Sequence, residues 1–148
     1  MTLPAEVRLT SLRGRWTEES AQRSVESWLK LNVANKVQVD LIGAQNDLMA
    51  MGARRAFETI KNSAEREKWL ALPFTGVDGL PKTGLAWVRS GQLAATVIVP
   101  TNAGQAMEMM AEAVQTGRAI PEKSFTAPES FPALDSLASM APKLAPTV

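Results

Sequence analysis

Strand-like runs alternate with helix-like segments along most of this chain, and this alternation restricts the fold more than any other feature. Four apolar or alternating runs are each followed by a segment whose apolar residues recur at helical spacing. Helices of this length supply the right-handed crossovers that parallel strands require. The sequence therefore predicts an α/β fold with three α/β/α layers, built on an open, mostly parallel, doubly wound sheet.

The expected elements follow from local patterns. We expect strands over 7–12, 37–42, 70–77 and 93–99, and helices over 18–31, 47–61, 83–90 and 103–116. The fourth strand is apolar almost throughout, which is typical of a strand buried on both faces. Thr17 and Asn102 are expected N-caps, and Gly91 and Gly117 stand where helices commonly end. We interpret the methionines of the helix over 103–116 as packing residues, because methionine fills gaps in cores.

The length and the proline distribution indicate one domain followed by a tail. A chain of 148 residues has room for one substantial core. Nine prolines occur, and five of them lie from Pro121 onward. We therefore expect one α/β lobe over 1–120 and a proline-rich tail over 121–148. The tail should carry one short helix near 132–140 and end in a poorly ordered segment.

The composition excludes several classes of function. The chain has no cysteine and no histidine, which excludes Ser-His-Asp hydrolases, cysteine nucleophiles and thiolate metal sites. The net charge is +1 and no basic cluster occurs, so nucleic acid is not an expected partner. We expect no enzyme and no cofactor or metal.

No export signal or membrane span is expected from the sequence. Residues 1–6 lack the charged head and apolar core of a signal peptide, and no apolar run approaches the ~20 residues of a membrane span. The chain as given is expected to be soluble. If the protein is exported, its signal is not in this chain.

Polar residues without a core role follow the ends of the expected strands. In an open parallel sheet, ligands bind outside the carboxyl ends of the strands. The loops at that edge carry Arg15, Trp16, Gln45, Asn46, Asp47, Asp78, Thr101 and Asn102. Carboxylates and amides can pair with adjacent hydroxyls, and an indole can stack on the apolar face of a sugar ring. This edge is therefore a candidate carbohydrate site.

Each of these residues also has a structural interpretation. Asn46 or Asp47 suits the N-cap of the following helix, and a capping residue can still face a cleft. Asp78 and Gly79 form a turn signal. Trp16 could pack over the sheet edge, and Arg15 could be a surface charge. Neither GxGxxG nor GxxxxGK[ST] occurs, so no phosphate loop is expected.

Three stretches resemble a known family. They read AQNDLMAMGARRAFETI, FTGVDGLPKTGLAWVRSGQLAATVIVP and NAGQAMEMMAEAVQTG, in that order. Together they resemble the C-terminal lobe of the type I periplasmic sugar-binding proteins, which serve ABC transporters for ribose, xylose, galactose and related sugars. The ligand-sensing domain of lactose-repressor-type regulators is similar. The resemblance covers roughly Val7 to Gly117 and implies two lobes joined by a hinge, of which this chain matches one.

The resemblance also implies roles for individual residues. Asn46 matches a position that hydrogen-bonds sugar hydroxyls, and Asp78 matches a carboxylate that accepts from them. Asp47 lies beside the site and is expected to cap the helix. Val99 stands where ribose binders usually carry glutamine. The resemblance does not assign one residue of 13–17 to the arginine that contacts sugar in ribose binders. Both departures argue against ribose, and Trp16 could serve a different sugar or an unrelated small molecule.

We expect the solute-binding component of a bacterial ABC sugar transporter, acting in the periplasm. The alternative is the effector-binding lobe of a lactose-repressor-type regulator. The implied partners are a sugar, an ABC permease of the inner membrane and the missing N-terminal lobe. A homodimer of this fragment, formed through the face that the missing lobe should cover, is the further alternative.

Overall fold

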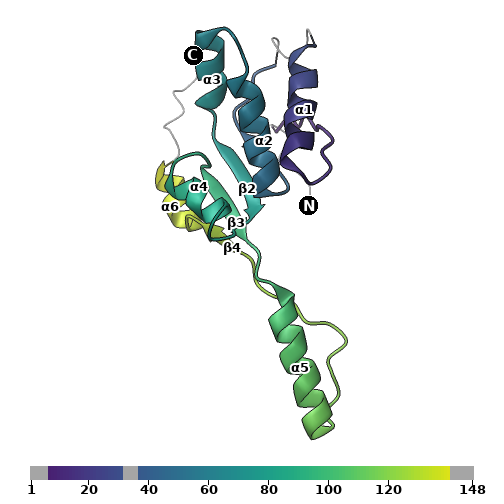
Figure 1. The fold of residues 1–148 in the computed structure, drawn as a ribbon. Coiled ribbons are helices and arrows are strands. Elements are labelled where there is room, and N and C mark those ends of the chain that lie inside the picture. The colour runs from purple at the N-terminus through teal and green to yellow at the C-terminus, as the bar shows by residue number, and fades with distance from the viewer. Residues whose placement is uncertain (1–6, 32–36, 141–148) are drawn as a thin grey trace.

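The computed structural model describes residues 7–31 and 37–140 (Figure 1). Its helices are α1 (Glu18–Leu29), α2 (Asp47–Glu58), α3 (Ser63–Leu70), α4 (Gly84–Arg89), α5 (Asn102–Thr116) and α6 (Leu134–Met140). Its strands are β1 (Ile42–Gly43), β2 (Phe74–Asp78), β3 (Ala95–Ile98) and β4 (Glu129–Phe131). Within the described ranges, no helix combines the length and the apolar character that a bilayer crossing requires.

The strands form one open sheet in the order β1-β2-β3-β4. β1, β2 and β3 run parallel, and β4 pairs with β3 in the antiparallel sense. The helices between the parallel strands provide their crossovers, and α2 and α4 pack against the sheet. The predicted α/β class with an open, mostly parallel sheet and flanking helices is confirmed.

The core lies where α2 packs between α1 and the sheet. The small residues of α2 let these elements approach closely: a Cβ added to Gly52 would lie 2.9 Å from the carbonyl carbon of Glu18. Beyond the small residues, Phe57 stacks on Trp69 with ring centroids 4.8 Å apart and meets Phe74 edge-on at 6.0 Å. These rings join α2, α3 and β2 in one aromatic cluster of the core.

Two of the expected helix ends are confirmed. Thr17 caps α1, since its side chain accepts from the backbone N–H of Ser20. Gly117 ends α5 in the left-handed conformation with φ 69°. The expected cap at Asn102 is wrong, because α5 begins at that residue and Thr101 is its N-cap without a side-chain hydrogen bond.

The amino-terminal half of the sheet is smaller than predicted. Residues 7–12 are described but form no strand, and of the range 37–42 only Ile42 belongs to a strand. The expected third strand starts late, because Leu70 ends α3. A strand needs a neighbour for its backbone hydrogen bonds, and β1 pairs with β2 alone in the described sheet. Alternating apolar residues in 7–12 therefore do not suffice for a strand here.

Helix α5 departs from its expected role. It leaves the body as a separate arm, at the opposite end of the molecule from α3 (Figure 1). None of its residues is buried, and Met107 is 64% exposed. The prediction that its methionines pack in a core is wrong for the described chain. Met107, Met110 and Val114, the apolar stripe of α5, are 64%, 46% and 86% exposed.

The proline-rich tail returns to the sheet. It runs back along α5, where Ser124 accepts from Gln105 and Thr126 donates to Asn102. It then forms β4, a strand that the sequence did not predict, and α6, which confirms the expected short helix. The expected disorder at the end of the chain falls on 141–148, outside the described residues.

Candidate functional site

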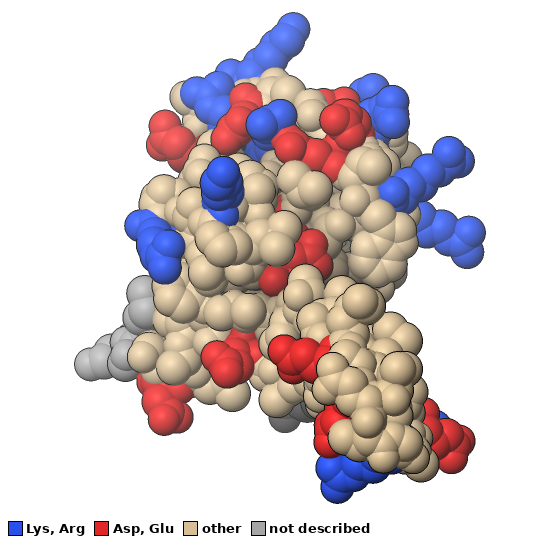
Figure 2. Space-filling view, turned by 60° about the horizontal axis from the view of Figure 1, so that its bottom comes forward, with Lys and Arg blue, Asp and Glu red and all other residues tan. Residues whose placement is uncertain are grey.

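The polar loops do gather at one edge of the sheet. β1, β2 and β3 are parallel, so the residues after Gly43, Asp78 and Ile98 share the carboxyl edge from which α5 emerges (Figure 1). The loop 13–17 joins them, because the Asn46 side chain donates to the carbonyl of Trp16 at 3.1 Å. Figure 2 views the molecule from this end, with acidic side chains near the base of α5 and most lysines and arginines at the rim.

Asn46 is the N-cap of α2. Its Oδ1 accepts from the backbone N–H of Met49 at 2.8 Å, while its Nδ2 binds the Trp16 carbonyl. The prediction that Asp47 caps this helix is therefore wrong. An amide group has two donors and two acceptor positions, so Asn46 keeps one N–H and one lone pair for another partner. Its ligand contact stays a prediction.

Asp47 is the first residue of α2, and its carboxylate is buried in the protein. The residue is 1% exposed. Oδ1 accepts from the hydroxyl of Thr96 on β3 at 2.6 Å, and Oδ2 accepts from the backbone N–H of Gly79 at 2.9 Å. Burial raises the pKa of Asp47 above its ordinary value of 3.8; the two hydrogen bonds oppose this shift, and the charge of Asp78 adds to it. Both carboxylate oxygens are thus used inside the protein.

Two glycines leave room for this carboxylate. A Cβ on Gly84 of α4 would lie 2.7 Å from the carboxyl carbon of Asp47, and one on Gly76 of β2 would lie 2.8 Å from its Cα. Real Cβ atoms do not come so close. Asp47 therefore joins α2, β2, α4 and β3. Sequence reasoning missed Thr96, although a lone hydroxyl inside an apolar strand is a signal for a buried polar partner.

Asp78 ends β2 in an unusual conformation. Its φ is 109°, and Gly79 follows with φ 64°. A side chain at Gly79 would clash with the backbone of Ile98, so glycine is required there. Asp78 is exposed, and its carboxylate has no hydrogen-bond or ion-pair partner among the described residues. It is both the turn residue and an acceptor that faces solvent.

Trp16 and Arg15 lie on the neighbouring loop. Trp16 has φ 63° and is 63% exposed, so its indole is available at the edge of the sheet. The backbone N–H of Arg15 donates to Ser20 Oγ at 2.8 Å, and its guanidinium is exposed. The structure thus places Trp16 next to Asn46. Ligand binding by Trp16, Arg15, Asn46 and Asp78 stays a prediction.

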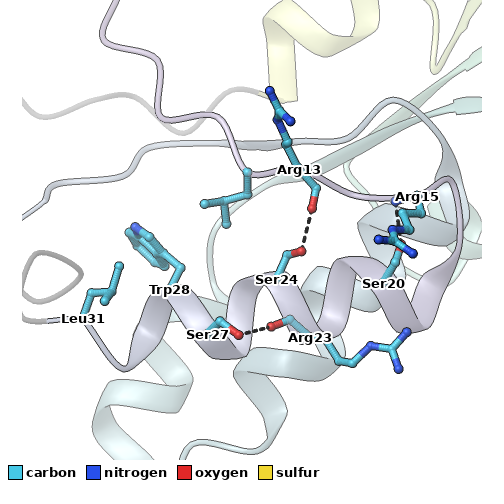
Figure 3. Close-up of a pocket in the computed structure, with 9 residues that line it drawn as sticks. Arg13, Arg15, Ser20, Arg23, Ser24, Ser27, Trp28 and Leu31 are labelled. Carbon is cyan, nitrogen blue, oxygen red and sulfur yellow. Dashed lines mark hydrogen bonds between the residues drawn. The ribbon is translucent and has the colours of Figure 1, made fainter.

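A groove of about 700 Å³ lies between residues 12–15 and α1 (Figure 3). Ser24 Oγ donates to the Arg13 carbonyl at 2.6 Å across its floor, and the side chain of Arg13 points away from α1. Arg15 lines this groove, whereas Asn46, Asp47 and Asp78 do not. The described residues contain no group of three acidic side chains that could hold a metal ion.

Comparisons with known proteins support the fold described above. No family model matches the chain. The chain is 34% identical over 110 residues to the D-galactose/methyl-galactoside binding periplasmic protein of Haemophilus influenzae, covering 74% of this chain and 30% of that protein. The fructose-binding periplasmic domain of a hybrid two-component system aligns with a TM-score of 0.64 and 26% identity, over 84% of this chain and 38% of that one. A Mycobacterium smegmatis protein in complex with β-D-fucofuranose aligns with a TM-score of 0.60 and 25% identity. That alignment covers 88% of this chain and 40% of the other.

The fold and these relatives define the class: the chain belongs to the family of type I periplasmic sugar-binding proteins. It corresponds to part of one lobe of such a protein, and it spans 30% of the curated relative and 38% of the first solved structure. The resemblance read from the three sequence stretches is confirmed.

Proposed function

We propose that this chain provides one side of a sugar-binding cleft in the solute-binding component of a bacterial ABC transporter. The observation that carries the proposal is the exposed, unpartnered Asp78 carboxylate, which lies at the same sheet edge as Trp16 and Asn46. The relative from Haemophilus influenzae, by its name, binds D-galactose and methyl-galactoside in the periplasm. We place the present protein in the same compartment.

The site chemistry suits a polyhydroxylated, uncharged ligand. The two oxygens of Asp78 can accept from adjacent hydroxyls, and the remaining N–H of Asn46 can donate to a hydroxyl. The exposed indole of Trp16 offers an apolar face for a sugar ring. Arg15 can donate from the rim of the same loop. A few convergent polar groups beside one aromatic face are typical of small-molecule sites.

The other side of the cleft belongs to the N-terminal lobe, which we propose closes over this edge. Two features support this arrangement. The chain spans only 38% of the first solved structure, and α5 carries an exposed apolar stripe. Helix α5 itself starts at the same edge as the candidate site (Figure 1). The permease of the inner membrane is the proposed partner of the closed protein.

A second candidate is a ligand-sensing domain of a signalling protein. The fructose-binding relative favours it, because that domain belongs to a hybrid two-component system. The effector lobe of a lactose-repressor-type regulator stays a prediction. The sugar chemistry of the site is the same in each case. Growth on the bound sugar after gene deletion separates the roles, since loss of a transport protein removes uptake even when the catabolic genes are expressed constitutively.

A thermal-shift screen of the whole two-lobed protein tests the proposal. The panel contains D-galactose, methyl-galactoside, D-fructose, D-allose, L-arabinose and myo-inositol. One sugar should raise the melting temperature, because a ligand that binds only the folded state stabilises it. Asp78→Asn should remove most of this rise. The control is Glu67→Gln on α3, an exposed carboxylate at the far end of the molecule, which should keep it. A panel without any shift would refute sugar binding.

A further inference from the structure

One buried acid has no part in the recognition chemistry above. The carboxylate of Asp47 is shielded from solvent, and both of its oxygens already accept hydrogen bonds within the protein. Burying a carboxylate is unfavourable, so its position needs an explanation. Among the described residues, its partners are Thr96 Oγ1 and the backbone N–H of Gly79. The second partner links it to the candidate site, since Gly79 follows Asp78 directly.

The turn at Asp78 and Gly79 is the segment that Asp47 holds. Both residues have positive φ, and a residue other than glycine rarely adopts such a conformation. Surrounding structure must therefore maintain the turn. The N–H of Gly79 points to Asp47 Oδ2, and the carbonyl of Asp78 accepts from the N–H of Val99 at 3.2 Å. These two hydrogen bonds hold both ends of the one peptide group that joins Asp78 to Gly79.

Thr96 fixes the other oxygen of the same carboxylate. Gly76 of β2 and Thr96 of β3 are register partners, so they present the same face of the sheet to Asp47. Gly76 leaves the space that the carboxylate occupies, and the Thr96 hydroxyl donates to it from the next strand. Thr96 is 1% exposed and cannot reach a ligand in solvent. Its hydroxyl can act on a ligand only through Asp47.

We propose that Asp47 and Thr96 are positioning residues for the sugar site: they hold the turn that presents the Asp78 carboxylate to the ligand. This inference rests on the proposed function, because Asp78 is taken as the group that contacts the sugar. The clamp is defined as Asp47, Thr96 and the Gly79 N–H. Its role is to keep the Asp78 carboxylate in one orientation before the ligand arrives, which lowers the ordering cost of binding.

The variants follow from the hydrogen-bond chemistry of the clamp. Asp47→Ala leaves the Gly79 N–H without an acceptor. Asp47→Asn keeps an oxygen for Gly79, and its NH₂ can donate to Thr96 Oγ1, because a hydroxyl also accepts. Thr96→Val removes the donor at nearly constant shape, whereas Thr96→Ser retains it. Asp47→Asn and Thr96→Ser are therefore the conservative variants, and both should retain sugar binding.

The first measurement is sugar affinity in the whole protein, by calorimetry with the panel sugar that gives the largest thermal shift. Asp47→Ala and Thr96→Val should each weaken binding on the order of tenfold, the effect of losing a hydrogen bond to a charged group. The conservative variants should stay within about threefold of the native protein. In an Asp78→Asn background, Asp47→Ala should add little further loss of affinity. Additive losses would overturn the proposal, since a clamp that acts through Asp78 has nothing left to position.

The second measurement needs no ligand. Hydrogen–deuterium exchange of the peptide around Gly79 should speed up in Asp47→Ala and Thr96→Val, while peptides from α1 keep their native rates. Unchanged exchange at Gly79 would overturn the clamp whatever the sugar result. Faster exchange together with no sugar binding would support the clamp and count against the proposed function. Thr96→Val provides this result if Asp47→Ala does not fold.

Discussion

At the residue scale, the buried carboxylate of Asp47 connects helix α2 to strand β3 and to the turn after strand β2. The motif AQND places two polar residues side by side, and the structure gives them different tasks. Asn46 caps α2 and holds the Trp16 loop, whereas Asp47 turns inward to Thr96 and Gly79. Local sequence could not separate these tasks, because both residue types suit an N-cap. The contact between Asp47 and Thr96 appears only in the folded protein, where Thr96 lies beside Gly76 in the sheet and Asp47 lies over both.

The raised pKa of Asp47 predicts a pH dependence of stability. The folded state binds this proton more tightly than the unfolded chain, whose pKa is near 3.8. The stabilisation from the protonated carboxyl is fully present below pH 3.8 and is lost as the pH rises through the folded pKa. The free energy of unfolding in urea is measured across this pH range for the native protein and for Asp47→Asn. As the pH rises, the native protein should lose stability relative to Asp47→Asn. Parallel curves for the two proteins would contradict it.

The glycines around Asp47 give a second prediction at this scale. Gly84→Ala should destabilise the protein by about 1–3 kcal/mol, because the new methyl group overlaps the Asp47 carboxylate. Gly104→Ala on α5 is the matched control: no atom lies within 4 Å of its added Cβ. Alanine is the better helix former, so this control should be neutral or stabilising. The midpoints of denaturant unfolding compare the stabilities of the two variants. Equal losses of stability would show that steric overlap is not the cause.

At the element scale, the sequence predicted elements well where one segment carries its own signals. Helix α2 has an N-cap, a small-residue face and an apolar stripe, and it appears as expected. Helix α3 was not among the expected elements, because half of its eight residues are charged and only Trp69 among them is buried. Strand β4 has three residues and is flanked by prolines, so no periodicity could reveal it. Residues 7–12 show the reverse case, in which a strand pattern lacks a pairing partner.

Two helix caps offer a matched comparison. Asn46 caps α2 and Asn62 caps α3, each by accepting from a backbone N–H three residues on. Alanine at either position should cost about 1 kcal/mol of stability, the usual value for an N-cap. Only Asn46→Ala should also weaken sugar binding, because it alone removes the proposed sugar contact and releases the Trp16 loop. Calorimetry and unfolding on both variants check this. An affinity loss of equal size in Asn62→Ala would point to general destabilisation.

At the scale of the whole molecule, the family was readable from three stretches of sequence, but the arrangement of the chain was not. The methionines of α5 were expected to pack in a core, and no residue of this helix is buried. An apolar stripe indicates that one face of a helix packs against a partner, but it does not indicate where that partner lies. The candidate site shares this property. Its residues were found from strand ends, while the surface that we propose faces them belongs to the other lobe.

That geometry limits how tightly this chain can bind a sugar by itself. With one side of the cleft, the hydroxyls that point away from Asp78 and Asn46 remain in water, and the ligand loses its freedom for few contacts. We expect an affinity of about 1 mM or weaker for every sugar of the panel, which corresponds to roughly 4 kcal/mol. The whole protein should bind its sugar at least a hundredfold more tightly, because a second lobe adds contacts and excludes water. Titration of a labelled chain by NMR measures the weak value, and calorimetry measures the strong one. Sub-micromolar binding by the isolated chain would mean that the complete site lies within these 148 residues.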